Sequence, residues 1–351
     1  MSKRSHLIES ITETIADYRD GEIPAPTPEH VNKWVKQFET PVQIDILSEV
    51  DHILKQTYWS KDRVIEDLTD TLETKKLAGK NPASFWKSAN FLNIQQLGSS
   101  QEDFLNLLND ILKKIYGFNI NECGSPDGPY IYIDDCLFTG GHIIGDIKSW
   151  IEDNGVNDAE LHIIVIGCHQ LGEYFAEKDL IPVAKKKKVN VKLWRTETIE
   201  NRKFNINQSQ VLRPTTIPNE PHVIEYVKKL EELGRKPLLR KPMKATVAPF
   251  SSERRRQILE EAFLVAGAYI IDQCQKPAVS MRPLGYWNIH ELGFGSLFIT
   301  YRNCPNNCPL AFWWGDPDAS PSHPFSKWYP LVPRKVNKSY EIGDFEFNWD
   351  I

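Results

Sequence analysis

The hydrophobic residues between positions 7 and 77 recur at the three- and four-residue spacing of amphipathic helices, as in HVNKWVKQF and VQIDILSEVDHILKQTYW. The Pro-rich stretch IPAPTP interrupts this pattern, because proline disrupts a helix interior. The pattern therefore predicts a helical leader over residues 1–85.

From residue 86 onward the pattern changes to short apolar runs that alternate with longer amphipathic stretches. The apolar runs are ANFLNIQ, PYIYID, LHIIVIG and VNVKLW, and helical patterns such as EDFLNLLNDILKKIYGF separate them. Strands of about four to eight residues separated by helices are typical of a parallel, doubly wound sheet. We therefore predict an α/β fold with a parallel Rossmann-like sheet, whose core spans residues 86–195.

The remaining chain divides into two stretches of different composition. Residues 196–250 are rich in proline, lysine and arginine and predict a basic insertion on the surface. Residues 251–351 begin with the helical pattern SSERRRQILEEAFLVAGAYIIDQC and continue with many aromatic residues and prolines. We expect this last stretch to form an aromatic-rich α+β region that completes the domain.

Length and composition exclude several classes of protein. A chain of 351 residues with 41% hydrophobic residues is long enough to bury a sizeable core. It has no apolar run near the roughly 18 residues of a membrane span, and MSKRSHLIES lacks the apolar centre of a secretion signal. We expect a cytoplasmic protein with reduced cysteines, and Cys304 and Cys308 lack the second close pair that a zinc site needs.

The charge is unevenly distributed, although the net charge is only −5. Residues 185–256 contain 19 Lys and Arg against seven Glu and no Asp, a net charge of +12. Such a segment is consistent with a solvated face, and it is also consistent with contact to nucleic acid. The sequence leaves both interpretations open.

The most informative motif is YIYIDDCLFTGGHIIGDI, residues 130–147, in which an apolar strand runs into two acids. Ligands of open α/β sheets bind at the carboxyl ends of strands, so Asp134 and Asp135 are expected at the mouth of a site. The Thr-Gly-Gly turn that follows opens a helix near His142, where backbone N–H groups favour an anion such as phosphate. A sugar phosphate would satisfy both preferences, whereas the simpler interpretation is a helix cap and a solvated turn.

The segment IYIDDCLFTGGH resembles the ribose-5-phosphate loop of type I phosphoribosyltransferases, a strand followed by D-D-x-x-x-T-G-x-T. In that family the acids hold the ribose hydroxyls of phosphoribosyl pyrophosphate (PRPP), and the turn holds the 5′-phosphate. The resemblance implies that Asp134 and Asp135 are the catalytic carboxylates and hold Mg²⁺ indirectly.

The same resemblance assigns the loop that follows the acids to the ribose phosphate. The residues implied in this contact are Phe138, Thr139, Gly140, Gly141 and His142. Two of them depart from the family pattern. His142 stands where the family usually has Thr or Ser, and Phe138 stands where purine-salvage members carry an Asp, which argues against purine salvage.

The family also has an upstream loop that binds pyrophosphate, and FLNIQQLGSSQEDF occupies that place. The candidates in this loop are small or polar: Gln96, Gly98, Ser99, Ser100 and Gln101. The basic residue often found there is absent, and we expect a positive charge to come from elsewhere, for instance Arg282, Arg302 or Arg334.

Over nearly its whole length the chain resembles a divergent phosphoribosyltransferase-like group of prokaryotic conflict systems, through HVNKWVKQF, QLGSSQ, RPLGYWNIHELGFG and WYPLVPR. This resemblance implies an antiphage effector, in some cases beside a retron reverse transcriptase with its small DNA and RNA. The predicted function is binding of PRPP or a related ribose phosphate or nucleotide with Mg²⁺, and transfer or cleavage at the anomeric carbon. Two alternatives remain open, a catalytically inactive nucleotide sensor and a nucleic-acid-binding adaptor; we expect no membrane partner, and an oligomer is compatible with the sequence.

Overall fold

The computed structural model describes residues 2–96, 98–154, 157–289 and 291–334. Contacts divide the chain into two compact units. Asp62–Arg202 form the first, which we call the α/β unit, and residues up to 61 together with those from 203 onward form the second, which we call the split unit. No helix in the described ranges is both long and apolar enough to cross a membrane.

The α/β unit is built on four parallel strands in the order β2-β3-β4-β5. Their bounds are β2 (Asn90–Phe91), β3 (Tyr130–Leu137), β4 (Glu160–His169) and β5 (Asn190–Ile199). The inner strand β4 is buried at nine of its ten positions, as expected for a parallel strand covered on both faces. The predicted α/β class with a parallel Rossmann-like sheet is confirmed.

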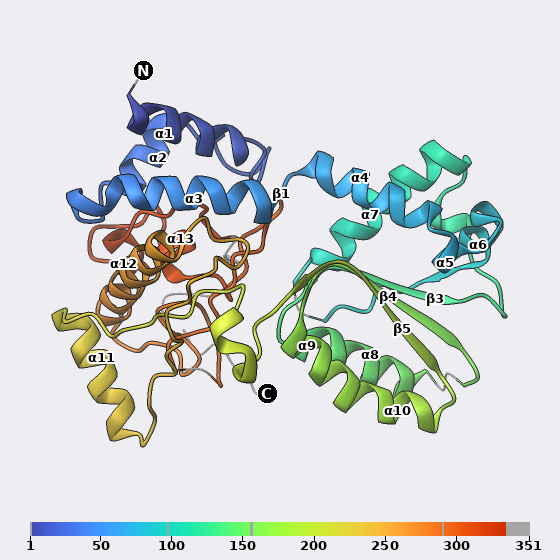
Figure 1. Ribbon diagram of the computed structural model, residues 1–351. Helices are drawn as coiled ribbons and strands as arrows, with labels where there is room; N and C mark the ends of the chain where they lie inside the picture. The colour runs from blue at the N-terminus through green and yellow to red at the C-terminus, as the bar shows by residue number, and fades with distance from the viewer. Residues whose placement is uncertain (1, 97, 155–156, 290, 335–351) are drawn as a thin grey trace. The chain divides into compact units, whose positions relative to one another are not determined.

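Helices cover both faces of this sheet. They are α4 (Lys61–Glu73), α5 (Lys75–Ala78), α6 (Pro82–Ser88), α7 (Ser100–Tyr116), α8 (Gly141–Asp153), α9 (Gln170–Phe175), the π-helical turn η3 (Ala176–Leu180) and α10 (Ile181–Lys186), with a 3₁₀ turn η2 (Ile120–Glu122). Figure 1 shows α8, α9 and α10 on one face and α4 and α7 on the other. Because β2 and β3 are parallel neighbours, the β2–α7 loop and the β3–α8 turn both begin at the carboxyl edge of the sheet.

The split unit joins the two ends of the chain in one core. Its elements are α1 (Lys3–Thr14), α2 (Pro28–Val35), α3 (Gln43–Thr57), β1 (Tyr58–Trp59), α11 (Pro221–Glu232), α12 (Glu253–Asp272), β6 (Ile299–Thr300) and α13 (Leu310–Trp313), with 3₁₀ turns η1 (Thr40–Val42), η4 (Lys203–Gln208) and η5 (Pro324–Lys327). β1 pairs with β6 in parallel. The indoles of Trp34 and Trp328 both donate to the carbonyl of Ala311, at 2.8 and 3.0 Å, so the N-terminal helices and the aromatic-rich region share their packing.

A cluster of buried charges lies inside the split unit. The Glu260 carboxylate, which has no exposed surface, forms ion pairs of 2.8 Å with Arg240 and Arg256. It also accepts a hydrogen bond of 2.9 Å from the backbone N–H of Arg213, whose guanidinium donates to the carbonyl of Phe294. These three arginines belong to the basic segment of residues 185–256, and their burial removes them from the surface that could meet nucleic acid.

Candidate functional site

The two acids of the motif lie within strand β3, not after its end. β3 continues through Leu137 because the longer strand β4 beside it extends the ladder, pairing Asp134 with Val165 and Leu137 with Cys168. Asp134 is 4% exposed and Asp135 is half-buried. The carboxylates therefore stand in the carboxyl-terminal half of an inner strand, close to the edge where ligands of such sheets bind.

Local hydrogen bonds fix the Asp134 carboxylate. Its Oδ1 accepts from the backbone N–H of Asp135 at 2.8 Å, and the Tyr132 hydroxyl lies 3.4 Å from Oδ2. Burial raises the pKa of the Tyr132 hydroxyl, and the negative charge of Asp134 raises it further. Tyr132 therefore remains a hydrogen-bond donor and helps to hold Asp134 in one orientation.

The turn after β3 presents backbone N–H groups at the start of α8. Gly140 precedes the helix with φ of +83°, a conformation that favours glycine, and it has no side chain that could cap the helix. The N–H of Gly141 makes a long contact of 3.3 Å with Oγ1 of Thr139, and Gly141 and His142 are exposed. Exposed backbone N–H groups at a helix start favour an anion, and the binding of a phosphate here stays a prediction.

Phe138 is held between β3 and the next strand–helix connection. Its ring lies 5.1 Å from that of His169, centre to centre and tilted by 31°, and its carbonyl oxygen packs against Gly172 of α9. A Cβ on Gly172 would lie 2.4 Å from that oxygen. His169 is fully buried at the end of β4, and its Nδ1 lies 3.6 Å from Sγ of Cys136. The aromatic pair therefore packs the end of β3 against the end of β4.

The β2–α7 loop is tied together by two glutamines. Oε1 of Gln101 accepts from the backbone N–H groups of Ile94 and Gln95, at 2.6 and 2.9 Å. In return Gln95 accepts from the N–H of Gln101 at 3.0 Å and donates to Oγ of Ser100 at 2.8 Å. Gln101 is fully buried, so its side chain shapes the loop and does not face solvent.

The other candidates of this loop lie nearer the surface. Gln96 and Gly98 are exposed, and Gly98 has φ of +97°. Ser99 is half-buried, with its Oγ 3.3 Å from Asp103. Leu97, between Gln96 and Gly98, lies outside the described residues. The exposed backbone around Gly98 is thus the part of the loop that can approach an anion.

Asp146 links the two loops, and the motif analysis missed it. It lies on α8, is 7% exposed and accepts a hydrogen bond from the backbone N–H of Gln96. Burial raises the pKa of its carboxyl group, while His142 acts in the opposite direction. Its Oδ2 is buried and has no hydrogen-bond partner among the described residues. The sequence does contain a sign of this residue, because an acid at the border of the apolar stripe of Ile143 and Ile147 is expected to be partly buried.

Two further amides also escaped the sequence analysis: Gln170, which follows β4, and Asn201, which follows β5. Oδ1 of Asn201 accepts from the N–H of Leu171 at 3.0 Å, and Asn201 is 1% exposed. Nδ2 of Asn201 and Oε1 of Gln170 are buried without a hydrogen-bond partner within the described ranges. Buried polar atoms of this kind mark places where a bound molecule or water completes the hydrogen bonding.

The donor set suits a magnesium ion that is shared with a ligand. The described residues contain no group of three or more His, Cys, Asp or Glu side chains arranged to hold a metal by themselves. Mg²⁺ commonly binds through one or two carboxylates together with phosphates and water. Asp134 and Asp135 fit that role, in which the ligand supplies most of the oxygens.

The basic residues named as alternative sources of positive charge belong to the split unit. Arg282 is 7% exposed and donates to the carbonyls of Val279 and Met281 at 2.6 and 3.0 Å. Burial lowers the pKa of Arg334, whose guanidinium lies 5.6 Å from the ring of Trp313. Arg302 lies in the same unit. Within the described part of the α/β unit, the β2–α7 loop has no basic residue of its own.

Comparison with known proteins gives one family. A family model described as PRTase-CE matches residues 31–334, a span that includes most of both units. No curated protein matches the chain.

Proposed function

The chain belongs to the PRTase-CE family and is phosphoribosyltransferase-like, and from this premise we propose that the carboxyl edge of its sheet binds PRPP or a related ribose phosphate or nucleotide. The observation that carries the proposal is the adjacency of two loops. The β3–α8 turn and the β2–α7 loop leave neighbouring parallel strands, and Asp146 joins them through the N–H of Gln96. One molecule with two phosphate-bearing ends could contact both.

Each element has a distinct part in the proposed complex. Asp134 and Asp135 accept hydrogen bonds from the ribose hydroxyls, and N–H groups of Gly141 and the first turn of α8 hold the 5′-phosphate. The exposed backbone at Gly98 faces the pyrophosphate or its counterpart. Bound Mg²⁺ would neutralise phosphate charge and orient the leaving group.

Where the protein catalyses, we propose displacement at the anomeric carbon or hydrolytic cleavage there. The bond between that carbon and its leaving group breaks, the leaving group takes the electron pair, and the acceptor or a water molecule forms the new bond to the carbon. Positive charge develops on the ribose in the transition state. The carboxylates of Asp134 and Asp135 stabilise this charge, and the phosphate contacts hold the ring in place during the reaction. The half-buried Phe138 directly follows β3 and packs against the buried His169, so its ring stands beside the strand ends, where a base or other acceptor would lie.

A specific observation favours the alternative of a sensor without chemistry. The β2–α7 loop lacks a basic residue, and the side chains of Gln95 and Gln101 are already used to fix its backbone. Such a loop offers pyrophosphate only neutral donors. The adaptor alternative rests on the basic segment, in which Arg213, Arg240 and Arg256 are buried.

Calorimetric titration of the full chain with PRPP and Mg²⁺ tests the proposal. Asp134→Asn/Asp135→Asn should weaken binding at least about tenfold, because charge-assisted hydrogen bonds to the ribose are lost. Glu152→Gln/Asp153→Asn, at the exposed far end of α8, removes the same charge and should bind as the wild type does. A wild-type protein that binds neither PRPP nor any nucleotide would refute the proposal.

Mass spectrometry then separates enzyme from sensor. The protein is incubated with PRPP, Mg²⁺ and panels of bases and nucleotides, and products are compared with those of the Asp134→Asn/Asp135→Asn variant. A new glycosidic product or a cleaved nucleotide identifies the enzyme. Saturable binding that leaves every compound unchanged identifies the sensor. Binding of DNA or RNA that weakens steeply with salt would favour the adaptor.

We also propose a cytoplasmic effector role in antiphage defence, next to a retron reverse transcriptase and its small DNA and RNA. The support for this role is the resemblance to the phosphoribosyltransferase-like group of prokaryotic conflict systems. Phage plating on cells that carry the complete locus tests it, with wild type beside Asp134→Asn/Asp135→Asn. Equal plating on both, and on cells without the locus, would contradict the role.

A further inference from the structure

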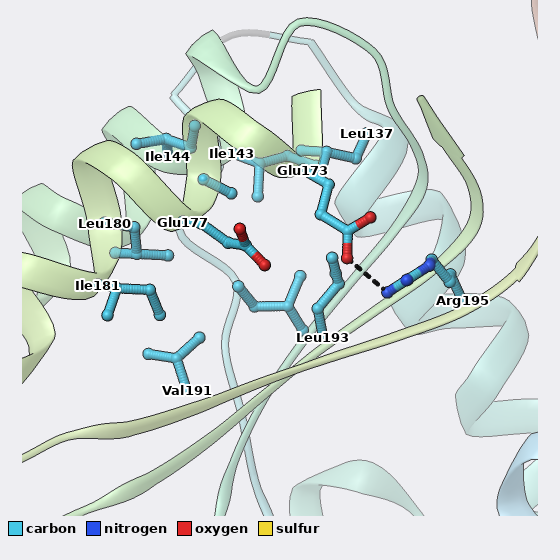
Figure 2. A pocket seen from close by; sticks show the side chains of 12 residues that line it. Leu137, Ile143, Ile144, Glu173, Glu177, Leu180, Ile181, Val191, Leu193 and Arg195 are labelled. Carbon is cyan, nitrogen blue, oxygen red and sulfur yellow. Dashed lines mark ion pairs between the residues drawn. The ribbon is translucent and has the colours of Figure 1, made fainter. Parts of the chain in front are cut away.

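A cavity lies behind the β3–α8 turn, on the face of the sheet that α8, α9 and α10 cover (Figure 2). Its volume is about 240 Å³, and we call it the rear pocket. Apolar side chains from three strands and from the first turn of α8 form its walls: Leu137, Ile143, Ile144, Ile163, Val191 and Leu193. The walls of the rear pocket are therefore mainly apolar, and one of their residues, Leu137, directly precedes the β3–α8 turn.

Three charged side chains stand at the rim of the rear pocket. Glu173 and Arg195 form an ion pair of 2.9 Å, drawn as the dashed line in Figure 2. Glu177 is exposed, has no ion-pair partner among the described residues, and directs its carboxylate toward the apolar walls in Figure 2. The rim thus carries one neutralised pair and one uncompensated negative charge.

The π-helical turn η3 shapes this side of the rear pocket. Pro182 follows the turn and cannot donate the backbone hydrogen bond that would continue a regular helix, which accounts for the irregular turn. Ala176, Glu177 and Leu180, three of the five residues of the turn, line the cavity. π-helical turns are rare in proteins, and those that occur are often found at functional sites. The turn and the cavity therefore both indicate a binding site here.

We propose that the rear pocket binds a small monocation with an apolar body, such as an arylalkylamine. The volume exceeds the roughly 150 Å³ of an apolar cavity that holds benzene and lies below the roughly 300 Å³ at which drug-sized pockets begin. One ring therefore fits against the walls, and its ammonium group pairs with Glu177. An anion is disfavoured because Arg195 is already paired and Glu177 repels it.

Methyl NMR on the full chain provides a direct test, because Ile143, Ile144 and Ile163 line the cavity and each carries a δ1 methyl group. The probes are 2-phenylethylamine, 2-phenylethanol and 3-phenylpropanoate, which share a ring and differ in charge. We expect the amine to shift these methyl signals saturably, the alcohol to bind more weakly and the carboxylate to leave them unchanged.

A matched pair of variants identifies the charge that selects the ligand. Glu177→Gln should weaken binding of the amine about fivefold at low salt, since a rim ion pair contributes up to about this much, and the difference should shrink at high salt. Asp179→Asn removes the same charge from the same turn at an exposed position outside the pocket and should bind as the wild type does. The proposal is overturned if none of the probes shifts the methyl signals, if the carboxylate binds as well as the amine, or if Glu177→Gln leaves the affinity unchanged.

Discussion

The two units of the protein bury charged side chains in opposite ways. In the split unit, Glu260 meets two guanidinium groups and a backbone N–H, so that both of its oxygens have partners. In the α/β unit, Asp146 is 7% exposed, and its buried Oδ2 has no hydrogen-bond partner within the described residues. Both sites remove a carboxylate from water, but only one replaces all of the lost hydrogen bonds.

This difference separates a structural cluster from a candidate site. A buried charge with every hydrogen bond satisfied is complete without a ligand, and removing one partner is costly. A buried carboxylate that is only partly satisfied is held in place by the surrounding fold, and such groups concentrate where a molecule is bound or transformed. The cluster of Glu260 with Arg240 and Arg256 belongs to the first kind, and Asp146 of the α/β unit belongs to the second.

The largest expected effect is the loss of the central carboxylate of the split unit. Glu260→Gln leaves the buried guanidinium of Arg256 without its ion-pair partner and leaves Arg240 paired with Glu253 alone, and we expect the unfolding free energy of this unit to fall by about 3–5 kcal/mol. Urea denaturation measures this change in the unfolding free energy. Glu261→Gln, next to it and half-buried, is the control and should change stability by less than about 1 kcal/mol. A small effect of Glu260→Gln would remove the distinction drawn between the two units.

The second effect concerns the packing that holds the candidate site. Gly172→Ala places a Cβ 2.4 Å from the carbonyl oxygen of Phe138, and we expect the α/β unit to lose about 1–3 kcal/mol by overpacking. Gly145→Ala, on α8 with no atom within 4 Å of the added Cβ, should be neutral or stabilise by about 0.5–1 kcal/mol. Thermal unfolding compares the two variants. Equal stability of the two variants would show that Gly172 of α9 is not packed tightly against the carbonyl of Phe138.

The third effect has the opposite sign. Because burial raises the pKa of Asp146 in the folded protein, the wild type loses stability as the pH rises from the ordinary Asp value through that raised pKa. Asp146→Asn cannot ionise, so it should equal or exceed the wild type by up to about 1 kcal/mol at pH 7. The advantage should vanish near pH 4, where the wild-type carboxyl group is protonated. Urea denaturation of both proteins at both pH values measures this difference, and a loss of stability of the variant at pH 7 would show that the carboxylate is structural. A substitution of His142, one turn earlier on α8, serves as a second variant because the charge of His142 acts on the same carboxyl group.

The smallest effect lies on the exposed side of α12. Arg254 pairs with Asp45 at 2.9 Å, but its side chain is 72% exposed, so Arg254→Gln should cost less than about 0.5 kcal/mol. The comparison with Arg256, 2% exposed and two residues later, isolates burial as the cause of any difference. Arg256→Gln removes one partner of a buried pair and should cost several times more in the same urea titration. Similar losses for the two variants would contradict this ranking.

Hydrophobic periodicity was sufficient to predict the sheet but not its limits. All four apolar runs of residues 89–194 contain a parallel strand, because short apolar segments separated by helices have few other stable arrangements. The lengths of the strands depend on contacts with neighbouring segments, which the hydrophobic pattern does not show. β2 is limited to Asn90–Phe91, since Gln95 and Gln101 hold the following residues in a loop, whereas β3 extends past its acids along β4.

The local motif likewise predicts less than the whole site. The β3–α8 turn is encoded by adjacent residues, and the structure places Gly140 in the positive-φ conformation that such a turn needs. The roles of those residues in binding stay predictions. Gln170 and Asn201 become candidates only through burial and missing hydrogen-bond partners, which depend on contacts between distant segments, and the same contacts single out Asp146 from the other acids of the chain. The division into four stretches by composition stays a prediction as well, beside the two units that contacts define.

The interruption of the split unit has a consequence for protein synthesis. Trp59 pairs with Thr300, so the ribosome delivers the complete α/β unit before the second half of the split unit exists. At about 5–20 residues per second, the apolar faces of α1–α3 remain without their partners for roughly 10–50 seconds. During translation, the faces of these N-terminal helices that pack against the later part of the split unit are therefore exposed for the longest time, while the α/β unit can already have folded.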